Sequence, residues 1–271
     1  MPGAQELRDR FRTLHESGCF VIPNPWDIGS ARLLVKLGFK ALATTSSGFA
    51  WSTGRRDNHI TLDDALAHMR SIASSVDAPV NADFEGGFAI DPEGVAANVA
   101  RAADTGIAGI SIEDATGDDS APLFDFDLAV RRVAAARQAI DRRTAGVFLT
   151  ARSEGFIVGR PDLDETIRRL SAFAEVGADC LYAPGIRTAD EIGAVVRAVA
   201  PRPVNVLVGG PFTTVDKLAA LGVRRVSVGG ALARSAWAGF LGAARELATH
   251  GTFTAFGAAV PFAEINGMFD E

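Results

Sequence analysis

Short apolar runs recur along the chain, and each is followed by polar or glycine-rich residues and then by an amphipathic segment. Between the runs, segments such as GSARLLVKLG and DETIRRLSAFAEVG carry apolar residues at helical spacing, and several end in glycine, as helices do at their C-terminal caps. The sequence predicts eight strands, whose runs begin at Cys19, Ala41, Val80, Gly109, Val147, Cys180, Val204 and Arg225.

Eight strand–helix alternations predict an α/β fold, a (β/α)8 TIM barrel. An open, doubly wound sheet would show the same alternation, but eight regular units and the lack of G-x-G-x-x-G after the first run favour the barrel. The segment AQELRDRFRTLHES predicts an N-terminal helix that caps the bottom of the barrel. A phenylalanine-rich tail begins at Thr252, and it packs either on its own barrel or on a neighbouring subunit. No linker divides the chain, so we expect one barrel domain over residues 1–271.

Composition excludes several classes of protein. The chain has 271 residues, of which 48% are hydrophobic, enough for a large core. Its net charge of −6, without long runs of either sign, argues against nucleic acid or an acidic membrane surface as a partner. No apolar run approaches the ~20 residues of a membrane span, the N-terminus lacks a signal-peptide core, and two cysteines are too few for a disulfide framework. We therefore expect a cytoplasmic protein.

Acidic side chains gather where the third and fourth strands end. In the stretch PVNADFEGGFAI, alternation along a strand places Asn81, Asp83 and Glu85 on one face. Glu113 ends the fourth strand, and Arg152 lies near the end of the fifth. Because barrel enzymes have their active sites at the C-terminal ends of the strands, we expect these groups to converge there.

Three carboxylates crowded at one site repel each other and lose hydration. A hard divalent cation relieves both penalties, and oxygen ligands of this kind suit Mg²⁺. The sequence therefore predicts a metal site with Asp83, Glu85 and Glu113 as ligands. The alternative is that these acids pair with arginines (Arg152, Arg55 or Arg56) or with backbone N–H groups and only close the barrel.

Absences narrow the chemistry further. A zinc site or a histidine-based triad is not expected, because no histidine lies at a strand end (His15, His59, His68, His250). No lysine is placed for a Schiff base (Lys36, Lys40, Lys217), and the two cysteines begin strands at the bottom of the barrel (Cys19, Cys180). An oxygen-ligated cation with Arg152 remains, which suits polarising an α-oxo acid and stabilising an enolate. The glycine pairs in VLVGGP and VSVGGA predict either a phosphate cradle or tight turns.

These same residues carry a family resemblance. The motifs NPWDIGSARLLVKLGFKALATTSSGFAWSTGRRD, NADFEGGF, GISIED and TARSEGF resemble the isocitrate lyase/phosphoenolpyruvate mutase superfamily in order and spacing. The resemblance implies a (β/α)8 barrel whose eighth helix is exchanged between subunits of a homodimer or homotetramer, with residues from about 231 to 271 packing on the partner. It also implies Mg²⁺, or Mn²⁺ in its place, and cleavage or formation of C–C or P–C bonds next to an α-oxo carboxylate through an enolate.

The resemblance also implies roles for single residues. Trp26 follows the first strand and is expected to bind substrate. The carboxylate and oxo end of the substrate would meet the segment Thr45, Ser46 and Ser47. Asp57 corresponds to an acid near the metal, Asp83 and Glu113 correspond to carboxylates that hold Mg²⁺ directly or through water, and Asn205 corresponds to a substrate-binding asparagine. Arg152 would contact the substrate and balance developing charge, so Arg152, Asp57 and Glu113 are the expected catalytic residues.

Departures from the family pattern restrict the reaction. The first acid of the third-strand motif is Asn81 here, which shifts the expected metal ligands toward Asp83 and Glu85. The lyases' mobile loop contains a cysteine within K-[KR]-C-G-H, whereas residues 114–128 read DATGDDSAPLFDFDL without Cys, Lys or His. We therefore do not expect isocitrate or methylisocitrate cleavage, which needs that general acid. The mutase's loop Lys and Asn are also missing, and Gly185 replaces the lyases' glutamate.

The prediction is an Mg²⁺-dependent lyase that acts on a small α-oxo or 2-hydroxy dicarboxylate, with decarboxylation of an oxaloacetate-like substrate fitting best. Two alternatives stay open. One is a hydrolase or mutase of the phosphonopyruvate type, acting on a P–C bond. The other is a non-catalytic barrel that binds oxo acids.

Overall fold

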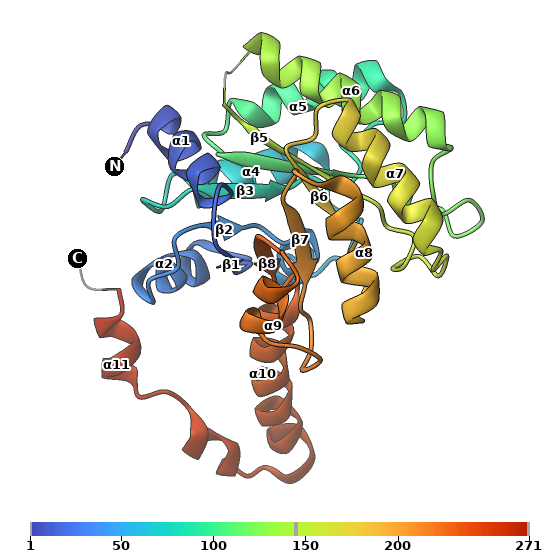
Figure 1. The fold of residues 1–271 in the computed structure, drawn as a ribbon. Helices are drawn as coiled ribbons and strands as arrows, with labels where there is room; N and C mark the ends of the chain where they lie inside the picture. Colours follow the sequence, from blue (N-terminus) through green and yellow to red (C-terminus); the bar gives the residue numbers. More distant parts are fainter. Residues whose placement is uncertain (1, 144–145, 270–271) are drawn as a thin grey trace.

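The computed structural model describes residues 2–143 and 146–269, and it confirms the predicted (β/α)8 barrel (Figure 1). Met1 and the last two residues of the predicted domain and tail lie outside the described residues. The strands are β1 (Phe20–Ile22), β2 (Leu42–Ala43), β3 (Val80–Asp83), β4 (Gly109–Glu113), β5 (Phe148–Arg152), β6 (Cys180–Tyr182), β7 (Val204–Leu207) and β8 (Arg225–Ser227).

The helices that connect and cover these strands begin with α1 (Ala4–Leu14), α2 (Ile28–Lys36), α3 (Ser46–Ser52), α4 (Leu62–Ala73), α5 (Pro92–Ala103) and α6 (Phe126–Arg143). They continue with α7 (Leu163–Glu175), α8 (Ala189–Val199), α9 (Val215–Ala220), α10 (Ala231–His250), the 3₁₀ helix η1 (Thr254–Ala258) and α11 (Phe262–Gly267). Capping boxes begin α2, α4 and α8, in which Asp27, Thr61 and Thr188 accept hydrogen bonds from the first-turn backbone.

All eight strands are parallel, in the order β1-β8-β7-β6-β5-β4-β3-β2. The barrel is nearly closed between β1 and β2, where the Ala43 N–H donates to the Pro23 carbonyl at 3.0 Å. The Asn24 amide also donates to the Thr44 carbonyl at 3.0 Å. Parallel pairing brings the C-terminal ends of all strands to one rim, which is where the acids lie.

The helix α1 covers the bottom of the barrel, as predicted. Its Phe11 is fully buried against Phe148 at the start of β5, with the two rings edge to face at 5.5 Å. Arg8 donates to the carbonyls of Ile107 and Ala103, which precede β4. This end of the barrel is therefore closed, and access to the interior comes from the opposite rim.

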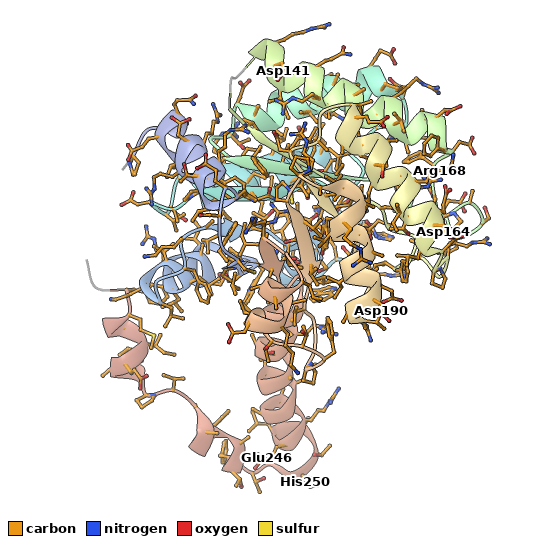
Figure 2. The ribbon with its side chains drawn as sticks, in the orientation of Figure 1. Asp141, Asp164, Arg168, Asp190, Glu246 and His250 are labelled. Atoms are coloured by element: carbon orange, nitrogen blue, oxygen red, sulfur yellow. The ribbon has the colours of Figure 1, made fainter. Side chains whose placement is uncertain are left out.

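The C-terminal segment leaves the barrel along α10, so that η1 and α11 stand apart from the strands (Figure 1). Figure 2 shows Glu246 and His250 near the far end of α10. The segment returns only at its end, where Lys36 of α2 donates to the carbonyls of Gly267 and Met268 at 3.0 and 3.2 Å. No helix within residues 2–143 and 146–269 is both long and apolar enough to cross a membrane.

Candidate active site

Arg152, at the end of β5, lies at the centre of an acidic cluster at the barrel rim. Its Nη1 is 2.7 Å from Asp83 Oδ1 and 3.0 Å from Glu113 Oε2, and its Nε is 2.8 Å from Glu154 Oε1. The register places Glu113 of β4 directly opposite Arg152, and Asp83 of β3 opposite Ser111. Adjacent strands thus bring Asp83, Glu113 and Arg152 together, as the alternation indicated.

Ser46 holds the other oxygen of Asp83. The backbone N–H and the hydroxyl of Ser46 both donate to Asp83 Oδ2 at 2.9 Å. This contact is possible because α3 begins at Ser46 directly after β2, with Thr45 as its N-cap. Ser46, in the predicted substrate-binding segment, therefore orients Asp83.

Glu85 is not on the strand, contrary to the alternation expected through residue 85. The strand β3 ends at Asp83, and Glu85 occupies a turn with φ +47°, a left-handed conformation that is strained for a non-glycine residue. The turn is held by Arg132, whose guanidinium contacts the carbonyls of Gly86 and Ile90. Strain of this kind persists where surrounding contacts impose it and is common at functional sites.

The cluster carries more negative charge than Arg152 balances. Burial, and after it the charge of Asp83, raises the pKa of Glu85 to about 8. The same two causes raise the pKa of Asp57 above its usual value. Burial also raises the pKa of Glu113 and of Glu154, against the opposing effect of Arg152. Desolvation and like charges both disfavour the ionised carboxylates, so a further cation would be stabilised here.

The donor set fits a hard divalent cation. Glu85 Oε1 is buried and lacks a hydrogen-bond partner among the described residues. Asp57, Asp83 and Glu113 add carboxylate oxygens, the ligand type that Mg²⁺ prefers. Within the described part of the chain, however, no group of three acidic, histidine or cysteine side chains is arranged around a common metal position. Asp83 and Glu113 instead pair with Arg152, as the alternative interpretation expected, so a cation would compete with Arg152 for them.

A cavity of about 210 Å³ opens on this cluster. Of the predicted site residues it is lined by Thr45, Ser46, Ser47, Asp57, Asp83, Arg152 and Asn205, whereas Trp26, Glu85 and Glu113 are not among its lining residues. Arg152 Nη2 donates no hydrogen bond to any described residue, whereas Nε and Nη1 donate to Glu154 and Asp83. That nitrogen is therefore available to an anionic ligand in the cavity.

Asn205 is tied into a second network deeper in the barrel. Its Oδ1 accepts from Arg225 Nε at 2.9 Å, and its Nδ2 donates to Ser227 Oγ at 2.9 Å. Arg225 is 3% exposed and also donates to Thr150 Oγ1 at 3.0 Å. Sequence reasoning missed Arg225, since the first residue of a strand gave no sign that its side chain turns inward.

Glu154 connects the cluster to the loop after β4. Its backbone N–H donates to Asp114 Oδ1 at 2.8 Å, and Asp114 Oδ2 lies 3.1 Å from Arg169 Nη1 on α7. Arg169 also donates to the Phe124 carbonyl at 2.9 Å, which fixes the end of the loop. Nothing local in the sequence indicated Arg169, which lies 55 positions away from Asp114.

The glycine pair after β8 forms a tight turn. The N–H groups of Val228 and Gly229 both donate to Asn24 Oδ1 at 2.9 Å, and Gly229 has φ +51°. These donors are occupied within the protein, so this pair does not offer them to a phosphate. Of the two interpretations left open, the turn is the one that the contacts favour here.

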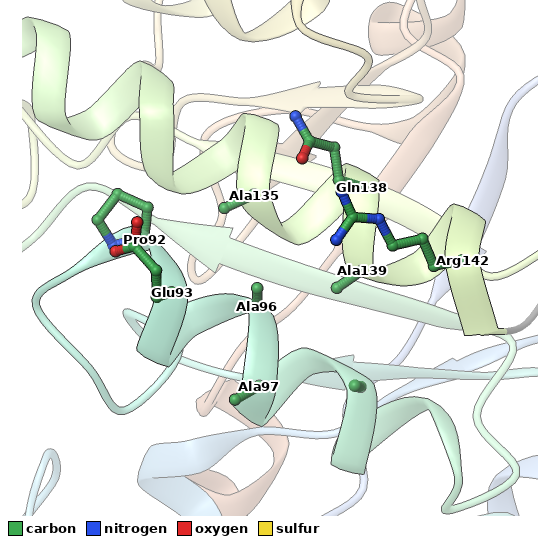
Figure 3. A pocket seen from close by; sticks show the side chains of 9 residues that line it. Pro92, Glu93, Ala96, Ala97, Ala135, Gln138, Ala139 and Arg142 are labelled. Atoms are coloured by element: carbon green, nitrogen blue, oxygen red, sulfur yellow. The ribbon is translucent and has the colours of Figure 1, made fainter.

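Another hollow lies in the outer ring between α5 and α6 (Figure 3). Its floor consists of alanines on both helices, including Ala96, Ala97, Ala135 and Ala139, with Glu93 and Arg142 at its edges. It contains no cluster of chemically reactive side chains. The rim cavity at Arg152 is therefore the candidate active site.

The fold is a TIM barrel, and its rim combines carboxylates from adjacent strands with one buried arginine. The family model for phosphoenolpyruvate phosphomutase matches residues 11–248 of this chain. The chain belongs to this family, within the phosphoenolpyruvate mutase/isocitrate lyase superfamily of lyases and mutases.

Similar proteins within the superfamily have several activities. An oxaloacetate decarboxylase of Pseudomonas aeruginosa (strain PAO1) is 30% identical over 234 residues, covering 82% of this chain and 78% of that protein. The crystal structure of a "putative lyase/mutase" from Burkholderia cenocepacia J2315 is 50% identical, with a TM-score of 0.95 over 99% of this chain and 97% of the other. Oxaloacetate acetylhydrolase in complex with its product oxalate is 26% identical, with a TM-score of 0.87 over 99% and 95% of the two chains.

Proposed function

We propose that this protein is an Mg²⁺-dependent lyase that cleaves a C–C bond next to the oxo group of a small dicarboxylate, in the manner of an oxaloacetate decarboxylase. The observation that carries the proposal is Arg152, which pairs with acids from adjacent strands and also lines the cavity. Named relatives that decarboxylate or hydrolyse oxaloacetate support the substrate class.

The cavity suits a substrate of few carbons. Its volume of about 210 Å³ corresponds to roughly seven water molecules at ~30 Å³ each. Ser46 and Ser47 supply hydroxyl groups to the lining of the cavity, and Arg152 supplies a cationic donor. These groups can bind a carboxylate and an adjacent oxo group.

Loss of CO₂ from oxaloacetate breaks the C3–C4 bond and leaves its electron pair in an enolate, whose C3 then takes up one proton to give pyruvate. Asp83, Glu85 and Glu113, with Asp57 nearby, would hold Mg²⁺, which supplies Lewis-acid polarisation of the oxo group. Arg152 donates to the developing enolate oxygen, where a fixed cationic donor lowers the barrier because it is already oriented. Glu154, which is not among these metal-binding acids, pairs with Arg152 Nε and holds the guanidinium in that orientation. None of these steps requires the cysteine that the loop 114–128 lacks.

The test is to incubate the protein with Mg²⁺ and either oxaloacetate or phosphonopyruvate and to measure pyruvate, CO₂ and phosphate. We expect pyruvate and CO₂ from oxaloacetate above the spontaneous rate, and no phosphate from phosphonopyruvate. Phosphate release would identify the P–C hydrolase alternative. Oxalate binding that depends on Mg²⁺, without turnover of either compound, would identify a non-catalytic binding barrel.

Isocitrate and methylisocitrate serve as a second substrate test. Two curated 2-methylisocitrate lyases, from Corynebacterium glutamicum and Halalkalibacterium halodurans, are among the relatives at 29% and 27% identity. We propose that this chain cleaves neither substrate, because residues 114–128 offer no cysteine as general acid. Production of glyoxylate or pyruvate from them would contradict this proposal.

We also propose that the segment from about residue 231 packs on a second copy of the chain, giving a homodimer or homotetramer. Large apolar side chains are exposed along it, including Phe240 at 60%, Phe253 at 67% and Phe262 at 81%. Apolar patches of this kind are typical of protein interfaces. Light scattering on the purified protein tests the proposal, and a monomer at micromolar concentration would contradict it.

A further inference from the structure

The cavity at Arg152 continues into a larger hollow at the mouth of the barrel. This outer hollow, of about 710 Å³, shares wall residues with the inner cavity: Ser47, Asp57, Ile157, Leu207 and Gly230. The inner cavity is sized for a few carbons, whereas the outer hollow lies within the ~300–1,000 Å³ of typical ligand pockets. A substrate chain that begins at Arg152 can therefore extend outward without leaving the protein.

Two arginines from distant segments line the outer hollow. Arg187 precedes α8, where its backbone N–H donates to Glu191 Oε2 at 3.0 Å. Among the described residues, its guanidinium has no hydrogen bond or ion pair. Arg234, in the first turn of α10, donates from Nη2 to the Gly209 carbonyl at 3.1 Å. One cation is therefore anchored to the wall, and the other is free to meet a ligand.

Part of the remaining wall of the outer hollow is apolar, while Ser47 and Asp57 add polar groups to it. Ile157 and Leu207, which also line the inner cavity, and Phe212 contribute hydrocarbon or aromatic surface. Such a wall suits a methylene spacer. The paired guanidinium groups suit a carboxylate, which arginine binds with two parallel hydrogen bonds. The Val228 and Gly229 N–H groups are not available to a phosphate, because both already donate to Asn24.

Charge gives this arrangement a second consequence. The inner cluster is net acidic, so an anionic substrate approaching it meets repulsion unless cations lie on its path. Arg187 and Arg234 line the outer hollow, which shares five wall residues with the inner cavity. Cationic groups at a cleft mouth raise the local concentration of anions and their rate of association.

We propose that Arg187 and Arg234 form a subsite for a distal carboxylate, so that the preferred substrate is a 2-oxo or 2-hydroxy dicarboxylate longer than oxaloacetate. This inference rests on the proposed function for the oxo-acid end of the ligand. In this proposal the methylene chain of the substrate lies along the wall that the two cavities share. Its second carboxylate is bound by the two guanidinium groups.

The experiment compares ligands that differ only in the distal group. Binding of 2-oxoadipate and of 2-oxohexanoate, with oxalate as a probe of the inner cavity alone, is measured by calorimetry in the presence of Mg²⁺. We expect wild type to bind 2-oxoadipate at least tenfold more tightly than 2-oxohexanoate. Arg187→Ala and Arg234→Ala should each reduce that preference by about three- to tenfold, since exposed charge pairs contribute modestly, without changing oxalate affinity.

Arg197→Ala is the matched control, since Arg197 is an exposed arginine in the last turn of α8 and lines neither cavity. It should leave the preference unchanged. The subsite would be overturned if wild type bound 2-oxoadipate and 2-oxohexanoate equally well. It would also be overturned if the preference for 2-oxoadipate were unchanged in both Arg187→Ala and Arg234→Ala. Failure of the proposed reaction is seen separately, as an absence of oxaloacetate turnover in wild type, and binding preference in that case still supports the subsite.

Discussion

Two arginines lie inside the barrel at different depths, and their surroundings are opposite in character. Arg225, near the bottom, is bonded through all three guanidinium nitrogens to neutral groups: Asn205, Thr150 and, at 3.4 Å, the ring of His15. Arg152, at the rim, pairs with three carboxylates and lies over the ring of Tyr182, and its Nη2 donates no hydrogen bond to a described residue. The two side chains are close in the fold, because Thr150 and Arg152 lie on the same face of β5.

The difference supports Arg152, and not Arg225, as the arginine of the proposed reaction. Around Arg225 the buried donors are satisfied by side chains of the protein, which is the usual condition of a stable interior. Around Arg152 several acids share one cation, the pKa values of Asp57 and Glu85 are raised, and one Glu85 oxygen has no described partner. An excess of buried charge without local compensation is typical of a site that a ligand or ion completes.

Replacing Arg152 should have the largest effect. Arg152→Lys keeps the charge but cannot contact three acids while also presenting a donor to the cavity. We expect kcat/KM for the decarboxylation to fall about 10²–10³-fold, the usual effect of removing a positioned donor to developing negative charge. Arg137→Lys is the control, because Arg137 pairs with Asp179 at 3.0 Å at the other end of the barrel. A variant at Arg152 with near wild-type kcat/KM would show that the rim arginine is structural.

The second largest effect is expected from Mg²⁺, which should bind the acids around Arg152 and not the neutral groups around Arg225. A ligand that binds only the folded state at a hundred times its Kd raises the free energy of unfolding by about 2.7 kcal/mol. We expect Mg²⁺ to raise the Tm of wild type and EDTA to abolish turnover. The double variant Glu85→Gln/Glu113→Gln should lose the Mg²⁺-dependent rise.

The control for this experiment is Asp164→Asn, an acid at the exposed start of α7 whose side chain points outward (Figure 2). It should respond to Mg²⁺ as wild type does. An equal rise in Tm in the double variant would mean that the cation binds elsewhere and that the rim acids only pair with Arg152.

The fold and the upper cluster could be predicted from local patterns. Period-two alternation in GISIED and VFLTARSE is enough to place Glu113 and Arg152 on the inner face, and parallel pairing then brings them opposite each other. The same logic failed at Glu85, because a strand ends where its backbone contacts end. Here the turn bound by Arg132, a residue of α6, overrides the alternation.

The deeper and outer parts of the site could not be predicted in this way. Arg225 depends on acceptors from β5 and β7, and the outer hollow depends on Arg187 and Arg234, which are 47 positions apart. Each of these groups looks like an ordinary surface arginine in the sequence. Only the packing of separate strand–helix units decides which arginines turn inward or face a cavity.

Thr150→Val tests the network around Arg225, the deeper of the two arginines. It removes an acceptor of the buried Arg225 cation at nearly constant shape, and bonds to charged groups contribute about 1.5–3 kcal/mol. We expect the free energy of unfolding to fall by about 2 kcal/mol in urea denaturation. Thr105→Val, which removes a buried bond to the neutral Ala102 carbonyl, should cost only about 1 kcal/mol. Equal costs for the two variants would show that Arg225 does not depend on Thr150.

The smallest expected effect concerns pH and the lower network. Burial, followed by the charge of Arg225, lowers the pKa of His15 to about 3, and the ring stacks on Phe148 at 4.1 Å. Because the folded pKa lies below the unfolded value of ~6.5, His15 contributes stability above that pH. The contribution is lost as pH falls toward 3, since the unfolded state then binds the extra proton.

Urea denaturation at pH 6.5 and at pH 5 measures this linkage. Each pH unit below the unfolded pKa costs about 1.4 kcal/mol, so wild type should lose about 1–2 kcal/mol more than His15→Gln over this interval. His59→Gln, at an exposed loop histidine, should follow wild type. The buried His68 has the same sign of shift and contributes equally to all three proteins. His15→Gln could instead lose as much free energy of unfolding between pH 6.5 and pH 5 as wild type does. That result would mean that His15 is protonated in the folded state at pH 5. The groups around Arg225 would then not all be neutral, and the contrast with Arg152 would fail.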